Sequence, residues 1–172
     1  ALSRITPNDV NTWISLAEMY LYDQRPKRAL ASAEQAITLA PDNGDAKLFK
    51  GVALVKDRRQ REGIKVLQQA TAGPTQRPGW AWEYLGSAYY DLKMFPEAID
   101  AYTQAVKLQP ASIAAKQGLG LALKDGLRFA EALVVFEELK TANPNDPFPW
   151  RQIGYTYGYK LDADKAIPAF KQ

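Results

Sequence analysis

Apolar and small residues recur along this chain at intervals of 34 or 35 residues. The pattern consists of three series of equivalent positions. The first series has large side chains, the second has small residues four positions later, and the third has small residues in the second half of each unit. The series are Trp13, Lys47, Trp82, Lys116 and Trp150; Ala17, Gly51, Gly86, Gly120 and Gly154; and Ala29, Gly63, Ala98, Ala132 and Ala166. A period of this length predicts stacked supersecondary units, each of which buries its apolar face against its neighbours.

Each unit has the pattern of two amphipathic helices. In the third unit, Trp82, Leu85 and Tyr89 fall on one face of a helix at spacings of three and four residues. Pro96 suits the first turn of a second helix, because a proline there removes no hydrogen bond that the helix needs. Pro110 ends that helix, since the residue before a proline disfavours the α conformation. We therefore expect an all-α fold.

The phase of the pattern gives the expected organisation over 1–172, a single solenoid of about five helix-turn-helix units. The expected complete repeats are 10–43, 44–78, 79–112 and 113–146. Residues 1–9 match the tail of a preceding repeat, and 147–172 match an incomplete fifth repeat. Because solenoids need polar caps at their ends, this pattern favours a segment of a longer array.

The third unit resembles the tetratricopeptide repeat family. Its segments WEYLGSAYY at 82–90 and FPEAIDAYTQAVKLQP at 95–110 follow that family's 34-residue pattern closely, and the resemblance extends over essentially the whole chain. It implies a right-handed α-solenoid that acts as a protein-interaction scaffold. The second unit departs most from the pattern, because Gly63 replaces alanine and the segment 72–79 holds one extra residue. We expect its second helix to end early.

Composition excludes much of enzyme chemistry. The chain has no cysteine and no histidine, which removes the thiolate nucleophile, the commonest general base and the usual transition-metal ligands. The remaining acidic pairs, Asp42 with Asp45 and Asp162 with Asp164, lie at predicted turns, where aspartate is common as a cap. Neither pair has the spacing of a calcium loop. We expect no catalytic activity, no cofactor and no bound metal.

The net charge of +3 is concentrated in one turn, 56–65, which holds five basic and two acidic residues. Arg58, Arg59 and Arg61 lie there, and a solvated turn is the favoured interpretation. An acidic partner or an anionic membrane surface is the alternative. One basic turn on a neutral chain does not match the continuous basic surface of a nucleic-acid binder. No apolar run reaches the length of a membrane span, and both the cytoplasm and a bacterial periplasm or cell envelope stay open as compartments.

A second stripe runs along each first helix, beside the packing face. In the family these helices line a concave groove, so the resemblance implies that the stripe contacts a partner. The expected contact residues are Ile14, Glu18, Leu48, Val52, Trp80, Glu83, Tyr90, Gln117, Leu121, Lys124, Phe148, Arg151 and Tyr155. The aromatic members are the strongest candidates, because aromatic residues dominate binding hot spots. The basic groove residues of the members that bind chaperone C-termini are absent, since Ile14, Glu18, Trp80 and Tyr84 stand there instead.

These observations predict a non-enzymatic scaffold that binds a peptide segment or helix of a partner protein. Glu18, Asp45 and Glu83 lie toward one end of the stripe and Lys124 and Arg151 toward the other, which would give a bound segment a fixed direction. One alternative is a structural scaffold that self-associates through open array ends. A helical-repeat nucleic-acid binder is less favoured, because the stripe carries acidic side chains.

Overall fold

The computed structural model describes residues 8–159, which form nine α-helices and no strand. The helices are α1 (Val10–Tyr22), α2 (Pro26–Leu39), α3 (Gly44–Lys56), α4 (Gln60–Ala72), α5 (Pro78–Asp91), α6 (Phe95–Leu108), α7 (Ile113–Asp125), α8 (Phe129–Ala142) and α9 (Pro147–Tyr159). The expected tail at 1–7, the second helix of the fifth unit, and Asp162 and Asp164 lie outside the described residues.

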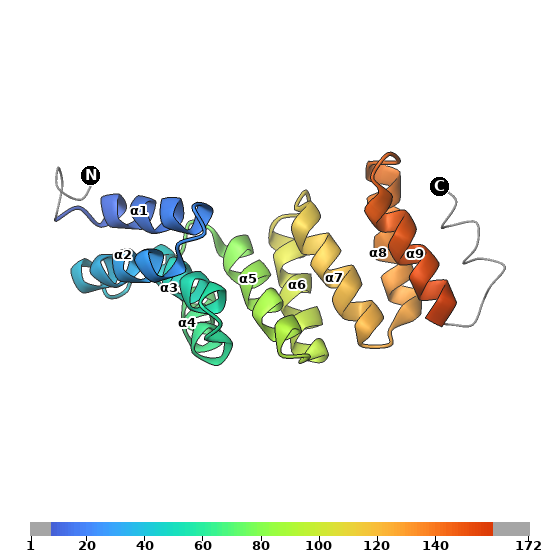
Figure 1. Cartoon of the computed structure of the whole chain (residues 1–172), viewed down its shortest axis with the longest axis horizontal. Coiled ribbons are helices and arrows are strands. Elements are labelled where there is room, and N and C mark those ends of the chain that lie inside the picture. Colours follow the sequence, from blue (N-terminus) through green and yellow to red (C-terminus); the bar gives the residue numbers. More distant parts are fainter. Residues whose placement is uncertain (1–7, 160–172) are drawn as a thin grey trace.

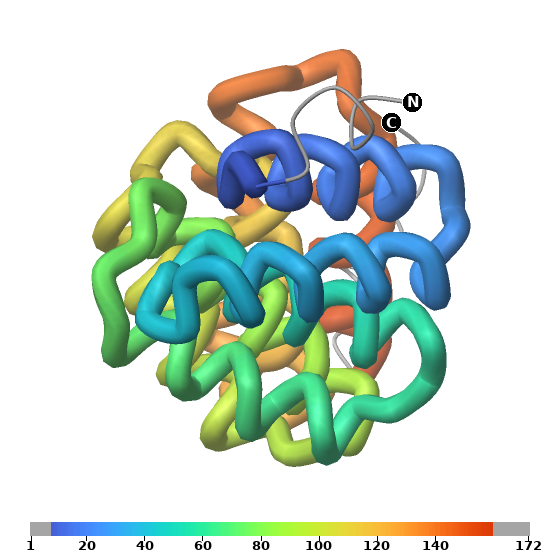
Figure 2. Tube along the Cα trace, turned by 90° about the vertical axis from the view of Figure 1, so that its left-hand side faces the viewer, coloured from blue at the N-terminus to red at the C-terminus, as the bar shows by residue number. Residues whose placement is uncertain are grey.

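The helices pack in chain order, each against the next, and form an α-solenoid as the sequence predicted. The first helices of successive units also contact one another, α1 with α3, α3 with α5 and α5 with α7. Figure 1 shows the array extending from α1 to α9, with α1 and α2 nearly along its long axis and α8 and α9 across it. In the view from the α1 end, the successive pairs turn about the long axis (Figure 2).

The hydrophobic core is distributed along the array rather than gathered in one centre. One cluster joins α1 and α2 to the start of α3, and a second joins α3 and α4 to α5. A third joins α6, α7 and α8 to Ile153 of α9. Every cluster draws side chains from neighbouring units, because a single helix pair cannot bury its apolar face alone.

The second unit ends as expected. Helix α4 stops at Ala72 and has 13 residues, whereas α2, α6 and α8 have 14 each. Gly73 follows in an extended conformation, with φ of −102° and ψ of 176°. The chain therefore leaves the helix early and has a longer segment, 73–77, to cross to α5.

The turn inside each complete unit contains one residue in the left-handed region. These residues are Gln24, Arg58, Lys93 and Leu127, with φ between 56° and 66°. They occupy the same position of the repeat, so the backbone conformation belongs to the unit and not to the particular side chain. A left-handed conformation costs a residue with a Cβ atom about 1–2 kcal/mol.

Replacement of Leu127 by glycine is expected to raise the free energy of unfolding by about 0.5–1 kcal/mol. Leu127 is 73% exposed, so little packing is lost, and the relief of strain exceeds the entropic cost of glycine in the unfolded chain. Urea denaturation followed by circular dichroism measures the change. Leu127→Ala is the matched control, because it removes the exposed side chain but keeps the Cβ atom. An equal gain in both variants would contradict this interpretation.

Candidate functional site

A pocket of about 600 Å³ opens on the face formed by the first helices α1, α3 and α5. We call it the first-helix pocket. Its lining residues are Glu18, Leu21, Tyr22 and Gln24 from α1 and the following turn, Phe49, Val52 and Lys56 from α3, and Trp80 and Tyr84 from α5. Four of these side chains are aromatic, and they come from three successive units. The pocket therefore exists only because the units stack.

Arg77 bridges the three helices around this pocket. It is the N-cap residue of α5, and its side chain reaches Glu18 of α1, with Nη2 at 3.2 Å from Oε2. Its guanidinium carbon lies 5.1 Å from the ring centroid of Phe49 and 5.4 Å from that of Trp80. These distances are typical of cation–π contacts. Nη1 of Arg77 is buried and has no hydrogen-bond partner among the described residues.

The segment 73–77 that carries Arg77 is fixed to the start of α3. The Gly44 amide donates to the Pro74 carbonyl at 3.0 Å. Asp45 accepts hydrogen bonds from the hydroxyl of Thr75 and from the amide of Gln76, the latter at 3.1 Å. The Thr75 hydroxyl in turn accepts from the Arg77 amide at 3.0 Å. Asp45 therefore holds this segment in place, and its expected role as an acidic charge that faces a ligand stays a prediction.

Two tyrosines on α5 have different surroundings. Burial raises the pKa of the Tyr84 hydroxyl, and the nearby carboxylates of Glu83 and Glu18 raise it further. Burial also raises the pKa of Tyr90, and the hydrogen bond that its hydroxyl donates to Asp125 adds to the effect. Both hydroxyls stay protonated at neutral pH. Tyr84 lines the first-helix pocket, whereas Tyr90 joins α5 to α7.

Some of the expected contact residues belong to the core. Leu48 is 0% exposed, Val52 1% and Ile14 8%, and all three lie in core clusters. The prediction that Ile14 and Leu48 contact a partner is therefore wrong, because neighbouring first helices use this part of the stripe to pack against each other. Val52 also lines the first-helix pocket, so any contact between Val52 and a partner would occur there.

Charged members of the stripe are occupied by contacts between units. Glu83 accepts a hydrogen bond from the hydroxyl of Ser112 at 2.9 Å. Lys124 donates to the side chain of Gln152 at 3.0 Å. Glu18 pairs with Arg77. These side chains therefore stabilise the stack, and the expected gradient of ligand-facing charge, acidic at one end and basic at the other, stays a prediction.

The remaining stripe residues lie outside the first-helix pocket. Leu121 and Phe148 are partly buried against the C-terminal core cluster, and Gln117 is half-buried on α7. Arg151 and Tyr155 are exposed on α9. Of the 13 expected residues, the pocket brings together Glu18, Val52 and Trp80. Contact of the others with a partner stays a prediction.

The pocket also contains residues that the stripe did not include. Phe49 and Tyr84 each lie one residue beyond a stripe position, and Tyr22 lies one helical turn beyond Glu18. One residue turns a helix face by about 100°, so a small error in the chosen face exchanges core and pocket residues. Arg77 could have been found from a different sequence feature. It lies in the segment 72–79, where one extra residue interrupts the regular repeat.

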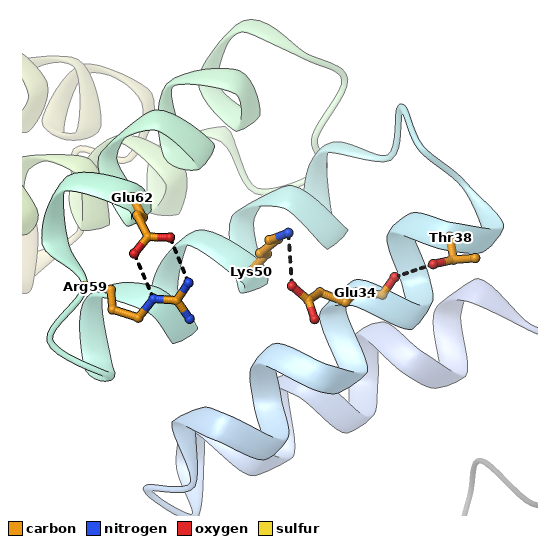
Figure 3. A network of polar contacts seen from close by, with 5 residues as sticks. All are labelled: Glu34, Thr38, Lys50, Arg59 and Glu62. Atoms are coloured by element: carbon orange, nitrogen blue, oxygen red, sulfur yellow. Dashed lines mark hydrogen bonds and ion pairs between the residues drawn. The ribbon is translucent and has the colours of Figure 1, made fainter.

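The basic turn of the second unit has a local structural partner. Arg59 forms two hydrogen bonds with Glu62, from Nε at 2.9 Å and Nη2 at 2.7 Å (Figure 3). This contact raises the pKa of Arg59. Arg128 and Glu131 form the same paired contact at the equivalent position of the fourth unit. The same arginine–glutamate contact therefore occurs in two units of the repeat. Arg58 and Arg61 are exposed at the turn.

Glu34 and Lys50 form a second polar contact near this turn. The ammonium of Lys50 on α3 lies 3.1 Å from the carboxylate of Glu34 on α2, and the hydroxyl of Thr38 donates to the Glu34 carbonyl at 2.9 Å (Figure 3). Lys50 is thus directed toward the neighbouring unit.

Between residues 8 and 159, no group of three or more acidic side chains is arranged to hold a metal ion. Within the same range, no helix is long and apolar enough to cross a membrane.

Residues 15–78 and 79–112 match two sequence families described as tetratricopeptide repeat, which together cover more than half of the chain. The chain belongs to the tetratricopeptide repeat family. This membership makes it a protein-interaction scaffold in the general sense of the family. The prediction of the family from the third unit is confirmed.

Two curated relatives are much longer proteins. The N-terminal acetyltransferase A complex auxiliary subunit NAA15 of Arabidopsis thaliana is 24% identical over 166 residues, which is 95% of this chain and 18% of that protein. Protein bimA of Emericella nidulans is 21% identical over 126 residues, 73% of this chain and 16% of that protein. The chain thus spans less than a fifth of the relatives it matches.

Solved structures confirm the fold. YrrB, described as a TPR protein with an unusual peptide-binding site, is 22% identical with a TM-score of 0.81, over 97% of this chain and 86% of that one. A MamA fragment from Desulfovibrio magneticus RS-1 is 17% identical with a TM-score of 0.82, over 94% of this chain and 91% of that one. At these identities the likeness concerns the fold alone.

Proposed function

We propose that this chain binds a segment of a partner protein in the first-helix pocket. The observation that carries the proposal is the recess of about 600 Å³ with aromatic side chains from three successive units. Its volume is in the range of sites that enclose small ligands or a few side chains of a peptide. Trp80 is 39% exposed and Tyr22 90% exposed, so large aromatic surfaces are available for contact.

The shape of the site favours a peptide segment over a flat protein surface. The lining residues come from α1, α3 and α5, so a ligand in the recess contacts three successive units. Glu18, Gln24 and Lys56 add polar side chains to an otherwise largely apolar and aromatic lining. An apolar floor with a polar rim is the usual composition of interfaces in which a few anchors supply most of the binding energy.

Replacement of Trp80 by alanine is expected to weaken peptide binding by about 2 kcal/mol, or about thirtyfold in Kd. Trp80 lines the pocket with a partly exposed side chain, and its truncation removes the largest aromatic group of the lining. Peptides selected by display against the chain provide ligands, and fluorescence anisotropy measures their Kd.

The matched control is Tyr155→Ala on α9. Tyr155 is an aromatic side chain of similar exposure, 47%, but it lies outside the first-helix pocket. The stripe included Tyr155 among the contact residues, but the proposal confines binding to the first-helix pocket, so we expect Tyr155→Ala to leave the Kd unchanged. If Tyr155→Ala abolishes binding and Trp80→Ala has no effect, the binding surface is at the other end of the array and the proposal is wrong.

A further inference from the structure

Arg77 fills a cage that has the composition of a cation-binding site. The guanidinium lies within cation–π distance of Phe49 and Trp80, and Glu18 supplies a carboxylate at 3.2 Å. Aromatic faces and a carboxylate together attract a positively charged group, and the planar guanidinium suits such a site better than an ammonium does. The cage walls come from helices α1, α3 and α5, whereas its occupant comes from the segment 73–77.

The cage does not satisfy every hydrogen-bond donor of the Arg77 guanidinium. Nη1 of Arg77 is buried without a hydrogen-bond partner in the described part of the chain. A buried donor without an acceptor opposes the bound arrangement, because the group has lost its hydrogen bonds to water. Arg77 therefore holds its place less firmly than a guanidinium with all of its donors paired.

Arg77 can leave the cage without disturbing the backbone around it. Its amide donates to the Thr75 hydroxyl, and Thr75 is in turn held by Asp45. The Arg77 side chain makes no capping hydrogen bond to α5. Rotation of the side chain toward solvent therefore preserves the contacts that fix the segment 73–77, while it exposes Glu18 and the two rings.

We propose that Arg77 is an internal placeholder for an arginine side chain of the partner segment. The inference rests on the proposed function of the pocket. The incoming guanidinium enters between Phe49 and Trp80, pairs with Glu18 and displaces Arg77. Once Arg77 is displaced into solvent, its Nη1 regains the hydrogen bonds to water that it lacks in the cage.

An anionic ligand is the competing possibility, and the cage favours it less. Glu18 already neutralises Arg77, so a carboxylate from a partner would have to replace Glu18 at the guanidinium. It would also approach the negative faces of Phe49 and Trp80. Lys56, at the rim of the pocket, is the other cation that such a ligand could meet. Probes of opposite charge distinguish a cationic ligand from an anionic one.

The test uses N-acetyl-arginine amide as the probe and the Trp80 indole signal in NMR as the readout, assigned with Trp80→Phe. We expect Arg77→Ala to bind the probe with a Kd about tenfold lower than the wild-type chain, because no internal occupant competes with it. N-acetyl-citrulline amide, which is isosteric but uncharged, should not bind. Glu18→Gln combined with Arg77→Ala should lose the gain.

Two results would overturn the inference. One is an equal Kd of the arginine probe for the wild-type chain and Arg77→Ala. The other is binding of N-acetyl-glutamate amide to the wild-type chain that Arg77→Ala abolishes, which would make Arg77 an anion contact. If peptides selected by display still depend on Trp80 in either case, the proposed function stands and this inference alone fails.

A second variant and a measurement on the wild-type chain guard against misfolding. Arg77→Gln keeps much of the aliphatic stem and should show the same gain in probe binding. In the wild-type chain, excess probe should move the Nε signal of Arg77 toward that of a solvent-exposed arginine. An unchanged Nε signal at saturation of the Trp80 shift would exclude displacement.

Discussion

Replacement of Leu48 by alanine is expected to lower the free energy of unfolding by about 3 kcal/mol. Leu48 lies on α3 with none of its surface exposed, in the central core cluster that also holds Leu67 and Leu85. Truncation removes buried apolar surface and leaves a cavity that the neighbouring helices close only in part. The variant tests a core role against the contact with a partner that the stripe predicted.

Urea denaturation followed by far-ultraviolet circular dichroism measures this loss. The matched variant is Trp80→Ala, which truncates a larger side chain that is 39% exposed at the pocket. We expect Leu48→Ala to change stability more than Trp80→Ala, and Trp80→Ala to change peptide affinity more than Leu48→Ala. The reverse order would show that the stripe faces the partner at Leu48.

Replacement of Gly44 by alanine is expected to lower the free energy of unfolding by about 3 kcal/mol, at the upper end of the range for an overpacked core. A Cβ atom at this buried position would lie 2.3 Å from the Pro74 carbonyl oxygen and 2.9 Å from the Thr75 nitrogen. These are backbone atoms, which cannot rotate away as a side chain does. The segment 73–77 would have to move from α3, and its hydrogen bonds with Gly44 and Asp45 would break.

Gly44→Ala should affect the pocket as well as stability. Displacement of the segment 73–77 would take Arg77 away from Glu18 and Trp80, and an NMR shift of the Trp80 indole would report it. Gly158→Ala is the control, since its added Cβ atom meets no heavy atom within 4 Å and alanine favours a helix over glycine. Equal stability of the Gly44→Ala and wild-type chains would mean that the segment is not tightly joined to α3.

This coupling gives the extra residue of the second unit a structural role. A regular repeat crosses from its second helix to the next unit in a short turn, as Ala40–Asn43 and Gln109–Ser112 do. The longer segment 73–77 instead packs on α3 and projects Arg77 back over α1. The irregularity therefore places against three pocket-lining residues, Glu18, Phe49 and Trp80, a side chain that the repeat pattern itself does not supply.

The sequence by itself determined the repeat and the fold. Helix starts at Val10, Gly44 and Ile113 follow the phase of the apolar and small residues, and α4 ends early where the pattern predicted. These features depend on contacts at fixed offsets along the chain, within a unit or between adjacent units. Such contacts leave a periodic pattern that can be recognised without knowledge of the packing angles.

Only the tertiary structure decided which side chains face the pocket. Leu48 and Phe49 are adjacent in sequence and both buried, at 0% and 3% exposed, yet of the two only Phe49 lines the pocket beside Arg77. Their separation depends on how far each first helix is rotated against the next, and one residue corresponds to about 100° of that rotation. The pairing of Arg77 with Glu18 depends in addition on a segment outside the repeat pattern. The periodic pattern predicts neither the rotation of the first helices nor the pairing of Arg77 with Glu18, because both depend on how three successive units pack together.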